Sequence, residues 1–588
     1  PSRFEFTRMI AHWDAYSDVH DYLAFVDEIQ PEVAQVGFYG AHFWSLAHTP
    51  QYAGYPSHFP VQGHAECGRW FEQLNGELRK RNVKVVGHMN VKFLVGDPDG
   101  PEGPRGFFRF YRDLWDEKEL GPRPVADPMD FLERDVEGKY RVDRSYQIGG
   151  MAEYWACLNN PHWRQILKAW TKRGIERGVD GYMINYFYRG NCLCEHCQKG
   201  FCEHLTGRFT PEELKQNFAI DDLTTHKFSE IISWHDPKES TPLRREMLRF
   251  SQLANKRTFD EVFIDYGKSI KPDLIVGQWN HIGDFGQINV DERCMLPADV
   301  WGKGEDYLWY STGGAAFYTD LKNKFLGDAT LQCRYIRGTF EDKPYTLGKY
   351  EHCRNRNAIA ELAANGGAPM GFYARFTDPI ARGVFKQYFS FLKRYDALYH
   401  ANSSTAEVVL LYPRRAVHEG NVAAVDQFKA VGRKLLDEHI LFDVRPDDLP
   451  PDALSSPYKH IVTIDNPDGL TAEQKQGLSR IEAPYTVRAS INRPATEHEL
   501  DLHLVNYNRE EPADPKTSGT GTVDEKPIAV SGIAVALVLP AGAKVAGVEL
   551  ITPETPDAVA LPATSEAGRV RFTVPEFLVY GVVRVRLE

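Results

Sequence analysis

The sequence predicts an α/β protein in which a (β/α)8 TIM barrel is followed by a flavodoxin-like α/β domain and a C-terminal β-sandwich. Apolar strands alternate with helical segments over the first 400 or so residues, as expected for parallel strands with crossovers. A second, shorter alternation follows, and the last part shows only strands and turns. With 588 residues the chain is long enough for several hydrophobic cores. We therefore expect domains at 1–400, 401–483 and 484–588.

Eight apolar segments are the predicted barrel strands. They are Phe6–His12, Val33–Tyr39, Val83–Met89, Gly181–Phe187, Leu274–Trp279, Tyr307–Tyr310, Tyr335–Phe340 and Ala368–Tyr373. Eight such units in about 400 residues suit a (β/α)8 barrel with long loops. A Pro- and Gly-rich stretch, Gly96 to Gly150, separates the third and fourth strands and is expected to cover the barrel mouth.

The two smaller domains show different patterns. In the second, three strands alternate with helices: Val408–Tyr412, a helix at Val425–His439, Leu441–Val444, His460–Ile464 and a helix from about Thr471. Its first strand lacks a Gly-rich phosphate loop, so no nucleotide is predicted. The third has the strands Leu502–Asn506, Ala534–Leu539, Val570–Thr573 and Val579–Leu587, with a polar linker at Arg509–Lys526.

Composition narrows the classes of partner. The net charge is −12 and the sequence has no basic stripe, which argues against nucleic acid. No run of about 18 apolar residues occurs, so no membrane span is expected. The N-terminus shows no positively charged and then apolar leader, so either none exists or it has been removed. The compartment stays open, and a soluble bacterial-type protein, cytoplasmic or periplasmic, is expected. The 12% aromatic content fits a neutral ligand.

Closely spaced cysteines predict a metal site. Cys192, Cys194 and Cys197 lie in one loop after the fourth strand, and zinc favours four sulfur or nitrogen ligands in a tetrahedron. Cys157 is the best-placed fourth ligand, with Cys67 and Cys202 as competitors. Four protein ligands would make the zinc structural, whereas an open fourth position with bound water would make it catalytic.

The cysteine segments resemble those of glycoside hydrolase family 42, the barrel β-galactosidases. The matching residues are Ala156-Cys157-Leu158-Asn159-Asn160-Pro161 and the run from Cys192 to Phe201. The resemblance in architecture covers nearly the whole chain, but the motif-level match is confined to these segments. It implies a zinc ion on the four cysteines, and a homotrimer in which the α/β domain packs between protomers.

The chain departs from that family at the end of strand four. The family has its acid/base Glu after an Asn there, but this sequence has Asn185-Tyr186. A tyrosine, with a pKa near 10, cannot replace a carboxylic acid that titrates near neutrality. The resemblance puts the nucleophile after strand seven, which indicates Glu341, and Glu305 is the expected acid. Glycosidases need two carboxyl groups, about 5–5.5 Å apart for retention or 6.5–9.5 Å for inversion.

Polar and aromatic residues at predicted strand ends are candidates for substrate binding. Sugar hydroxyls need donors and acceptors beside an aromatic surface, although any one of these residues could simply pack in the core. The candidates are His12, Asp14, His88, Asn185, Tyr186, Trp279, Asn280, Trp309, Tyr373 and Arg375.

The predicted function is that of a glycoside hydrolase acting on a galactoside or related oligosaccharide. Two alternatives stay open. The barrel could have lost its acid/base and bind carbohydrate without turnover, or the metal could serve a hydrolase that acts on another bond.

Overall fold

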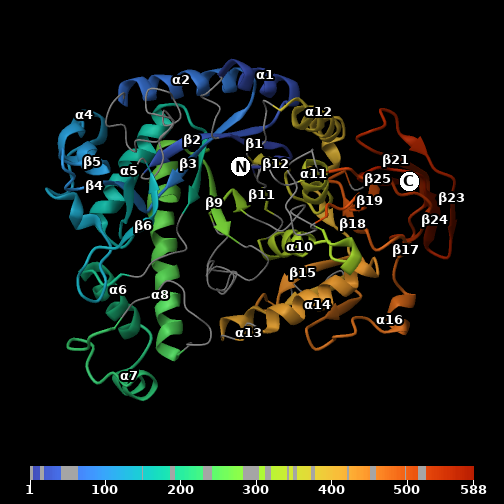
Figure 1. Cartoon of the computed structure of the whole chain (residues 1–588). Coiled ribbons are helices and arrows are strands. Elements are labelled where there is room, and N and C mark those ends of the chain that lie inside the picture. Colours follow the sequence, from blue (N-terminus) through green and yellow to red (C-terminus); the bar gives the residue numbers. More distant parts are fainter. Residues whose placement is uncertain are drawn as a thin grey trace.

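The structure is a computed structural model. It describes residues 4–12, 19–40, 64–148, 150–185, 192–229, 241–281, 304–311, 319–340, 343–348, 354–372, 378–419, 421, 423–450, 458–496, 498–513 and 525–588. Figure 1 shows the α/β domain below the barrel and the C-terminal β domain on the right. No helix among these residues has the length and apolar character needed to cross a membrane.

Eight parallel strands among the described residues form the barrel, which confirms the predicted fold. In spatial order they run β11-β10-β9-β8-β3-β2-β1-β12. The outer two are joined by a hydrogen bond from Ala368 N to Tyr345 O, 2.7 Å long. The strands are β1 Met9–His12, β2 Val33–Gly40, β3 Lys84–Asn90, β8 Gly181–Asn185, β9 Ile275–His281, β10 Tyr307–Ser311, β11 Tyr345–Gly348 and β12 Met370–Phe372.

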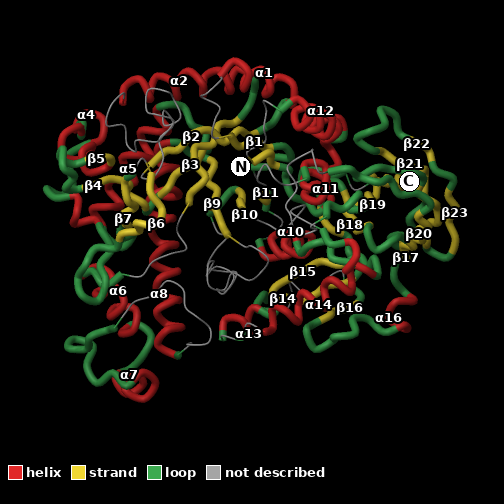
Figure 2. Tube along the Cα trace, in the orientation of Figure 1, coloured by secondary structure: helices red, strands yellow, loops and turns green. Residues whose placement is uncertain are grey.

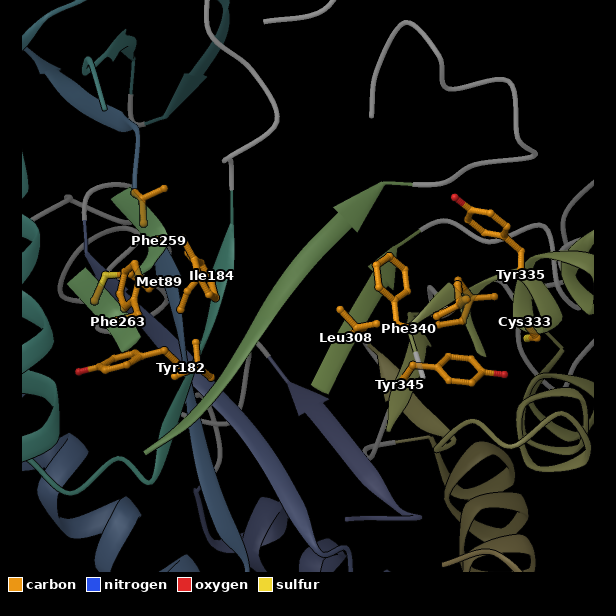
Figure 3. Packing of buried hydrophobic residues seen from close by; sticks show 14 of the residues in the cluster. Met89, Tyr182, Ile184, Phe259, Phe263, Leu308, Cys333, Tyr335, Phe340 and Tyr345 are labelled. Atoms are coloured by element: carbon orange, nitrogen blue, oxygen red, sulfur yellow. The ribbon is translucent and has the colours of Figure 1, made fainter. Parts of the chain in front are cut away.

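Alternation along each strand divides the side chains between the barrel interior and the surrounding helices. On β8, Tyr182 and Ile184 face outward and pack in the same cluster as Phe259 and Phe263, as Figure 3 shows. Met183, between them, belongs to the separate cluster inside the barrel. Neighbouring residues of one strand therefore pack on opposite sides, one in the barrel interior and the next against the helix layer.

The outer layer consists of helices that cover the barrel strands, and most of them are amphipathic (Figure 1). Several begin with a side-chain cap. Asn160 accepts hydrogen bonds from His162 N and Trp163 N, and Pro161 stands at the first helical position. The layer comprises α1 Val19–Ile29, α2 His64–Lys80, α5 Pro161–Glu176, α8 Pro242–Phe259 with its continuations η6 Asp260–Gly267 and α9 Lys268–Ile270, α10 Ala329–Thr339, α11 Asn355–Ala364, and α12 Pro379–Arg394 with η10 Asp396–Leu398.

One predicted barrel strand is wrong. Residues 335–339, expected to be strand seven, belong to α10, and the seventh strand is β11. All residues of α10 are buried, so the helix has no solvent-facing side. Arg334 donates to Ala489 O (2.7 Å) and Arg337 to Asn492 Oδ1 (2.6 Å), both in the C-terminal β domain. Because these arginines are buried beside aromatic and β-branched residues, the sequence of α10 lacks the alternation of apolar and polar residues that predicts a helix.

The long stretch between β3 and β8 forms a small antiparallel sheet with short helices. Its order is β5-β4-β7-β6, visible at the left of Figure 2. The elements are β4 Phe93–Asp97, β5 Arg105–Gly106, α3 Phe107–Arg109, η3 Phe110–Leu114, α4 Glu117–Leu120, η4 Pro128–Phe131, β6 Val142–Ile148 and β7 Met151–Trp155. After β8 come two further helices, α6 Glu195–Thr206 and α7 Pro211–Phe218, and η9 Leu321–Asn323 precedes α10.

The second domain has the predicted flavodoxin-like arrangement. Its three parallel strands lie in the order β15-β14-β16, so the first strand of the unit is central. Val408 of β14 pairs with Phe442 of β15 and with His460 of β16. The elements are β14 Val408–Tyr412, α13 Arg414–His418, α14 Ala423–Asp437, β15 Phe442–Pro446, β16 His460–Val462 and α16 Ala472–Gln476.

The C-terminal domain consists of two antiparallel sheets around one core, as predicted for a β-sandwich. The six-stranded sheet comprises β13 Ser403–Ser404, β18 Val487–Arg493, β19 Glu499–Asn506, β25 Tyr580–Leu587, β21 Val545–Ile551 and β22 Val559–Ala560. The four-stranded sheet comprises β17 Arg480–Glu482, β20 Ile533–Val538, β24 Arg569–Val574 and β23 Ala563–Glu566. Since β13 and β17 precede residue 484, these sheets draw on both sides of the expected boundary.

A buried carboxyl group on β19 makes stability depend on pH. Burial and the nearby Glu499 raise the pKa of Asp501 to about 8, despite the opposing effect of Arg584. In the unfolded chain Asp501 ionises near pH 4, so folding requires it to keep its proton between about pH 4 and 8. Each unit by which the pH rises in this window lowers the free energy of unfolding by up to about 1.4 kcal/mol, and above pH 8 the loss stays constant.

We therefore expect Asp501→Asn to stabilise the protein at pH 8 but not at pH 4. Urea unfolding at both pH values measures the difference, and the pH 4 experiment is the internal control. An equal effect at the two pH values would contradict the raised pKa of Asp501.

Candidate functional site

Four predicted substrate-binding side chains come together inside the carboxyl half of the barrel. They are His88 on β3, Asn185 on β8, Trp279 on β9 and Trp309 on β10, and all are buried. Trp279 and Trp309 are directly paired across neighbouring strands, so their side chains share the inner face. The C-terminal face of such a barrel is where catalytic and binding groups collect.

The two indole rings pack on each other in the barrel interior. The rings of Trp279 and Trp309 are stacked, with centroids 4.8 Å apart and planes 9° from parallel. The His88 ring lies against Trp279, with centroids 5.1 Å apart at 48°. Aromatic side chains beside polar groups at the carboxyl end of a barrel are typical of sites that bind a sugar ring.

His88 and Asn185 supply the polar part of this set. The Asn185 amide Nδ2 lies 3.0 Å from His88 Nε2. Complete burial lowers the pKa of His88 well below its usual value, so the imidazole is neutral at pH 7. The neutral ring accepts from the amide through Nε2, which places the ring proton on Nδ1.

Other predicted binding residues fall partly or wholly outside the described residues. The backbones of His12 and Asn280 lie at the carboxyl ends of β1 and β9, but their side chains are not described. Asp14, Tyr186, Tyr373, Arg375 and the predicted nucleophile Glu341 lie outside the described residues.

The predicted acid, Glu305, lies at the wrong end of the barrel. It precedes β10, and its neighbour Asp306 accepts from and donates to Val276 near the start of β9. Burial raises the pKa of Glu305 to about 7, with Lys256 and Lys343 opposing the shift. A raised pKa suits a general acid, but this carboxyl group lies at the N-terminal face, away from the catalytic face.

Glu341 does not follow strand seven in the sequence, because the segment before it is the helix α10. Strand seven ends at Gly348. Within three residues of the ends of the eight barrel strands, the sequence offers three carboxylates: Asp14 after β1, Asp284 after β9 and Glu351 after β11. Sequence reasoning missed Glu351 because it assigned strand seven ten residues too early.

The four predicted zinc ligands are brought together and buried. The Sγ atoms of Cys157, Cys192, Cys194 and Cys197 all lie within 4.8 Å of one another. Sγ of Cys157 is 3.4 Å from that of Cys197 and 3.5 Å from that of Cys194. A zinc ion with bonds of about 2.3 Å to four sulfurs requires S–S distances of roughly 3.8 Å in a tetrahedron. The cysteines therefore fit such an ion closely.

Polar hydrogens around the sulfurs also suit thiolates. Asn159 Nδ2 donates to Cys197 Sγ (3.2 Å), and Cys194 N donates to Cys192 Sγ (3.4 Å). Of the two competing ligands, Cys202 does not join this set. Cys202 lies on α6 with its Sγ 3.9 Å from Leu223 O, and the side chain of Cys67 is not described.

The cysteine cluster joins two segments that are distant in sequence. Cys157 follows β7, and Cys192 and Cys194 lead into α6. Both segments are also bound to a third, residues 131–134, since Cys157 N donates to Phe131 O (2.8 Å) and Leu193 N to Arg134 O (2.7 Å). A metal here would hold the loop after β8 against the inserted sheet.

Comparison with solved structures identifies the fold as one that glycosidases use. The chain is similar over 99% of its length to all of α-L-fucosidase isoenzyme 2 from Paenibacillus thiaminolyticus, with a TM-score of 0.61 and 13% identity. Gan42B, a GH42 β-galactosidase, matches with a TM-score of 0.62 at 11% identity, covering 100% of both chains. The β-galactosidase from Bacillus circulans sp. alkalophilus matches with a TM-score of 0.57 at 12% identity, and the match covers 99% of both chains.

The chain thus shares a glycoside hydrolase architecture from end to end, including the domains after the barrel. The sequence itself matches no protein-family model and no curated protein. At these identities the likeness concerns the fold, and the function must be argued from the site.

Proposed function

We propose that this protein is a glycoside hydrolase that cleaves a galactoside or a related oligosaccharide at the carboxyl end of its barrel. The observation that carries the proposal is the inward-facing set of His88, Asn185, Trp279 and Trp309. Stacked indoles and neutral donors recognise an uncharged ring with hydroxyls better than a charged ligand. The similar solved structures include two β-galactosidases and an α-L-fucosidase, which favour a glycoside as substrate.

Two carboxyl groups at the same end of the barrel would carry out the reaction. Glu351 is the candidate nucleophile or base, because it follows strand seven. Asp14 and Asp284 are the candidates for the acid, since no carboxylate follows β8 before Glu195 of α6. One group would protonate the leaving oxygen while the other attacks C1 or activates water.

Zinc on the four cysteines would be structural. All four sulfurs are close enough to bind one ion, which leaves it no position for water or substrate. This arrangement speaks against a metal-dependent hydrolase of another bond. The zinc would hold the loop after β8 beside the barrel mouth and supply no step of the reaction.

A panel of nitrophenyl glycosides tests the proposal. We expect turnover of a galactoside or fucoside in one anomeric configuration, with slower turnover of the other sugars. Replacing Trp279 by alanine is expected to raise KM, because Trp279 packs against both Trp309 and His88 and its loss disturbs the proposed sugar site. If no glycoside or oligosaccharide in the panel is hydrolysed, the protein is not a hydrolase of this class.

A carbohydrate-binding protein without catalysis is the second candidate function. Tyr186 is the observation that favours it, since the acid/base position of the resembled family lacks a carboxylate. Calorimetric titration with galactosides separates the two functions, because binding without turnover would support only this one. We further propose a homotrimer, as the resemblance implies, which light scattering would test.

A further inference from the structure

The C-terminal β domain reaches the barrel where two loops return from its mouth. After β10 the described chain resumes at Thr319, and after β11 it resumes at Arg354, the residue before α11. These are the downstream ends of the sixth and seventh strand-to-helix loops. Loops of this kind build the active site of a barrel enzyme.

Glu525 of the β domain binds the end of the seventh loop. Its Oε1 accepts from Arg356 N and its Oε2 from Arg356 Nη1, both at 2.6 Å. Arg356 lies in the first turn of α11, where backbone N–H groups have no partner within the helix. The Glu525 side chain has no exposed surface, so both bonds are shielded from water.

Glu511 binds the end of the sixth loop in a similar way. Its Oε1 accepts from Thr319 Oγ1 (2.6 Å), and its Oε2 accepts from Leu321 N (3.1 Å). Arg354 Nη1 donates to the same Thr319 hydroxyl at 3.3 Å. The ends of the two loops are thus connected to each other as well as to the β domain.

The two glutamates lie on backbone segments that pair with each other. Glu510 N donates to Lys526 O (3.1 Å), and Ile528 N donates to Asn508 O (2.9 Å). Asn506, the last residue of β19, adds a bond from Nδ2 to Ile528 O (2.8 Å). These bonds form a short ladder that continues β19 and links the segments that carry the two carboxylates.

We propose that Glu511 and Glu525 are positioning residues through which the C-terminal β domain holds Thr319, Leu321 and Arg356 at the downstream ends of the sixth and seventh strand-to-helix loops. The catalytic part rests on the proposed function, because the seventh loop carries Glu351 in the sequence. Neither glutamate contacts the reacting atoms. Their effect on turnover passes through the loop ends, where a displacement of about 1 Å can lower the rate roughly 100-fold.

Hydrogen–deuterium exchange of the full-length protein measures the loop ends directly. We expect Glu525→Gln to accelerate exchange in peptides covering 349–357, and Glu511→Gln in peptides covering 312–321, each by about tenfold. Glu499→Gln is the matched control. It breaks a two-bond pair with Arg584 in the same domain (2.9 and 3.0 Å) but contacts neither loop end.

Kinetics on the glycoside found in the panel complete the test. Both loop variants are expected to lower kcat by about 10- to 100-fold with little change in KM, while Glu499→Gln leaves kcat intact. Unchanged exchange at both loop ends overturns the proposal, as does faster exchange with normal kcat. If the wild type hydrolyses no glycoside but the exchange pattern holds, the proposed function fails and the anchoring of the loops stands.

Discussion

Serine in place of Cys197 is expected to abolish stoichiometric zinc binding and to lower the free energy of unfolding severely. Cys197 Sγ lies 3.4 Å from Cys157 Sγ and accepts from Asn159, so it is central to the cluster. Structural zinc contributes roughly 10–16 kcal/mol in small zinc-finger peptides. Even a third of that equals much of the roughly 5–15 kcal/mol that stabilises a typical domain.

Elemental analysis and thermal unfolding measure the two effects. Wild type should carry one zinc per chain, and a chelator should lower its Tm to that of Cys197→Ser. Cys202→Ser is the matched control, because Cys202 lies on the same helix outside the four-sulfur set. Equal zinc content in Cys197→Ser and wild type would show that this cysteine is not a ligand.

The four-cysteine cluster was predictable because its signal is local. Three cysteines within six residues can converge on one ion whatever the surrounding fold, and the segment around Cys157 completes the set. The inward direction of Trp279 and Trp309 was also predictable from local sequence, because both lie near the ends of short apolar strands. Alternation with period two determines which side chains face the interior once the strand is known.

The carboxylates were not predictable in this way, because their roles depend on whether they lie before the start or after the end of a strand. Glu305 lies two residues from β10, but before it, where it cannot reach the mouth. The choice of Glu341 depended on a strand predicted at 335–340, but residues 335–339 belong to the helix α10. In this helix the buried side chains of Arg334 and Arg337 donate hydrogen bonds to the β domain, more than 150 residues away in sequence. Long-range partners of this kind leave no trace in local periodicity.

Glutamine in place of Glu351 is expected to lower kcat by at least about 1000-fold, the largest effect among the carboxylates considered. Glu351 comes three residues after Gly348, where the seventh strand ends. A carboxylate that attacks C1 or activates water cannot be replaced by an amide of the same shape, because the amide is neutral and a poor nucleophile.

Glu305→Gln and Glu341→Gln are the controls of similar chemistry. Glu305→Gln should leave kcat within a few-fold of wild type, since this side chain is buried at the opposite end of the barrel. A loss of activity in Glu341→Gln with full activity in Glu351→Gln would restore the earlier assignment. The configuration of the wild-type product separates the two roles of Glu351, and NMR of the sugar first released measures it. A nucleophile gives a product of retained configuration, because C1 is displaced twice, whereas a base that activates water gives an inverted product.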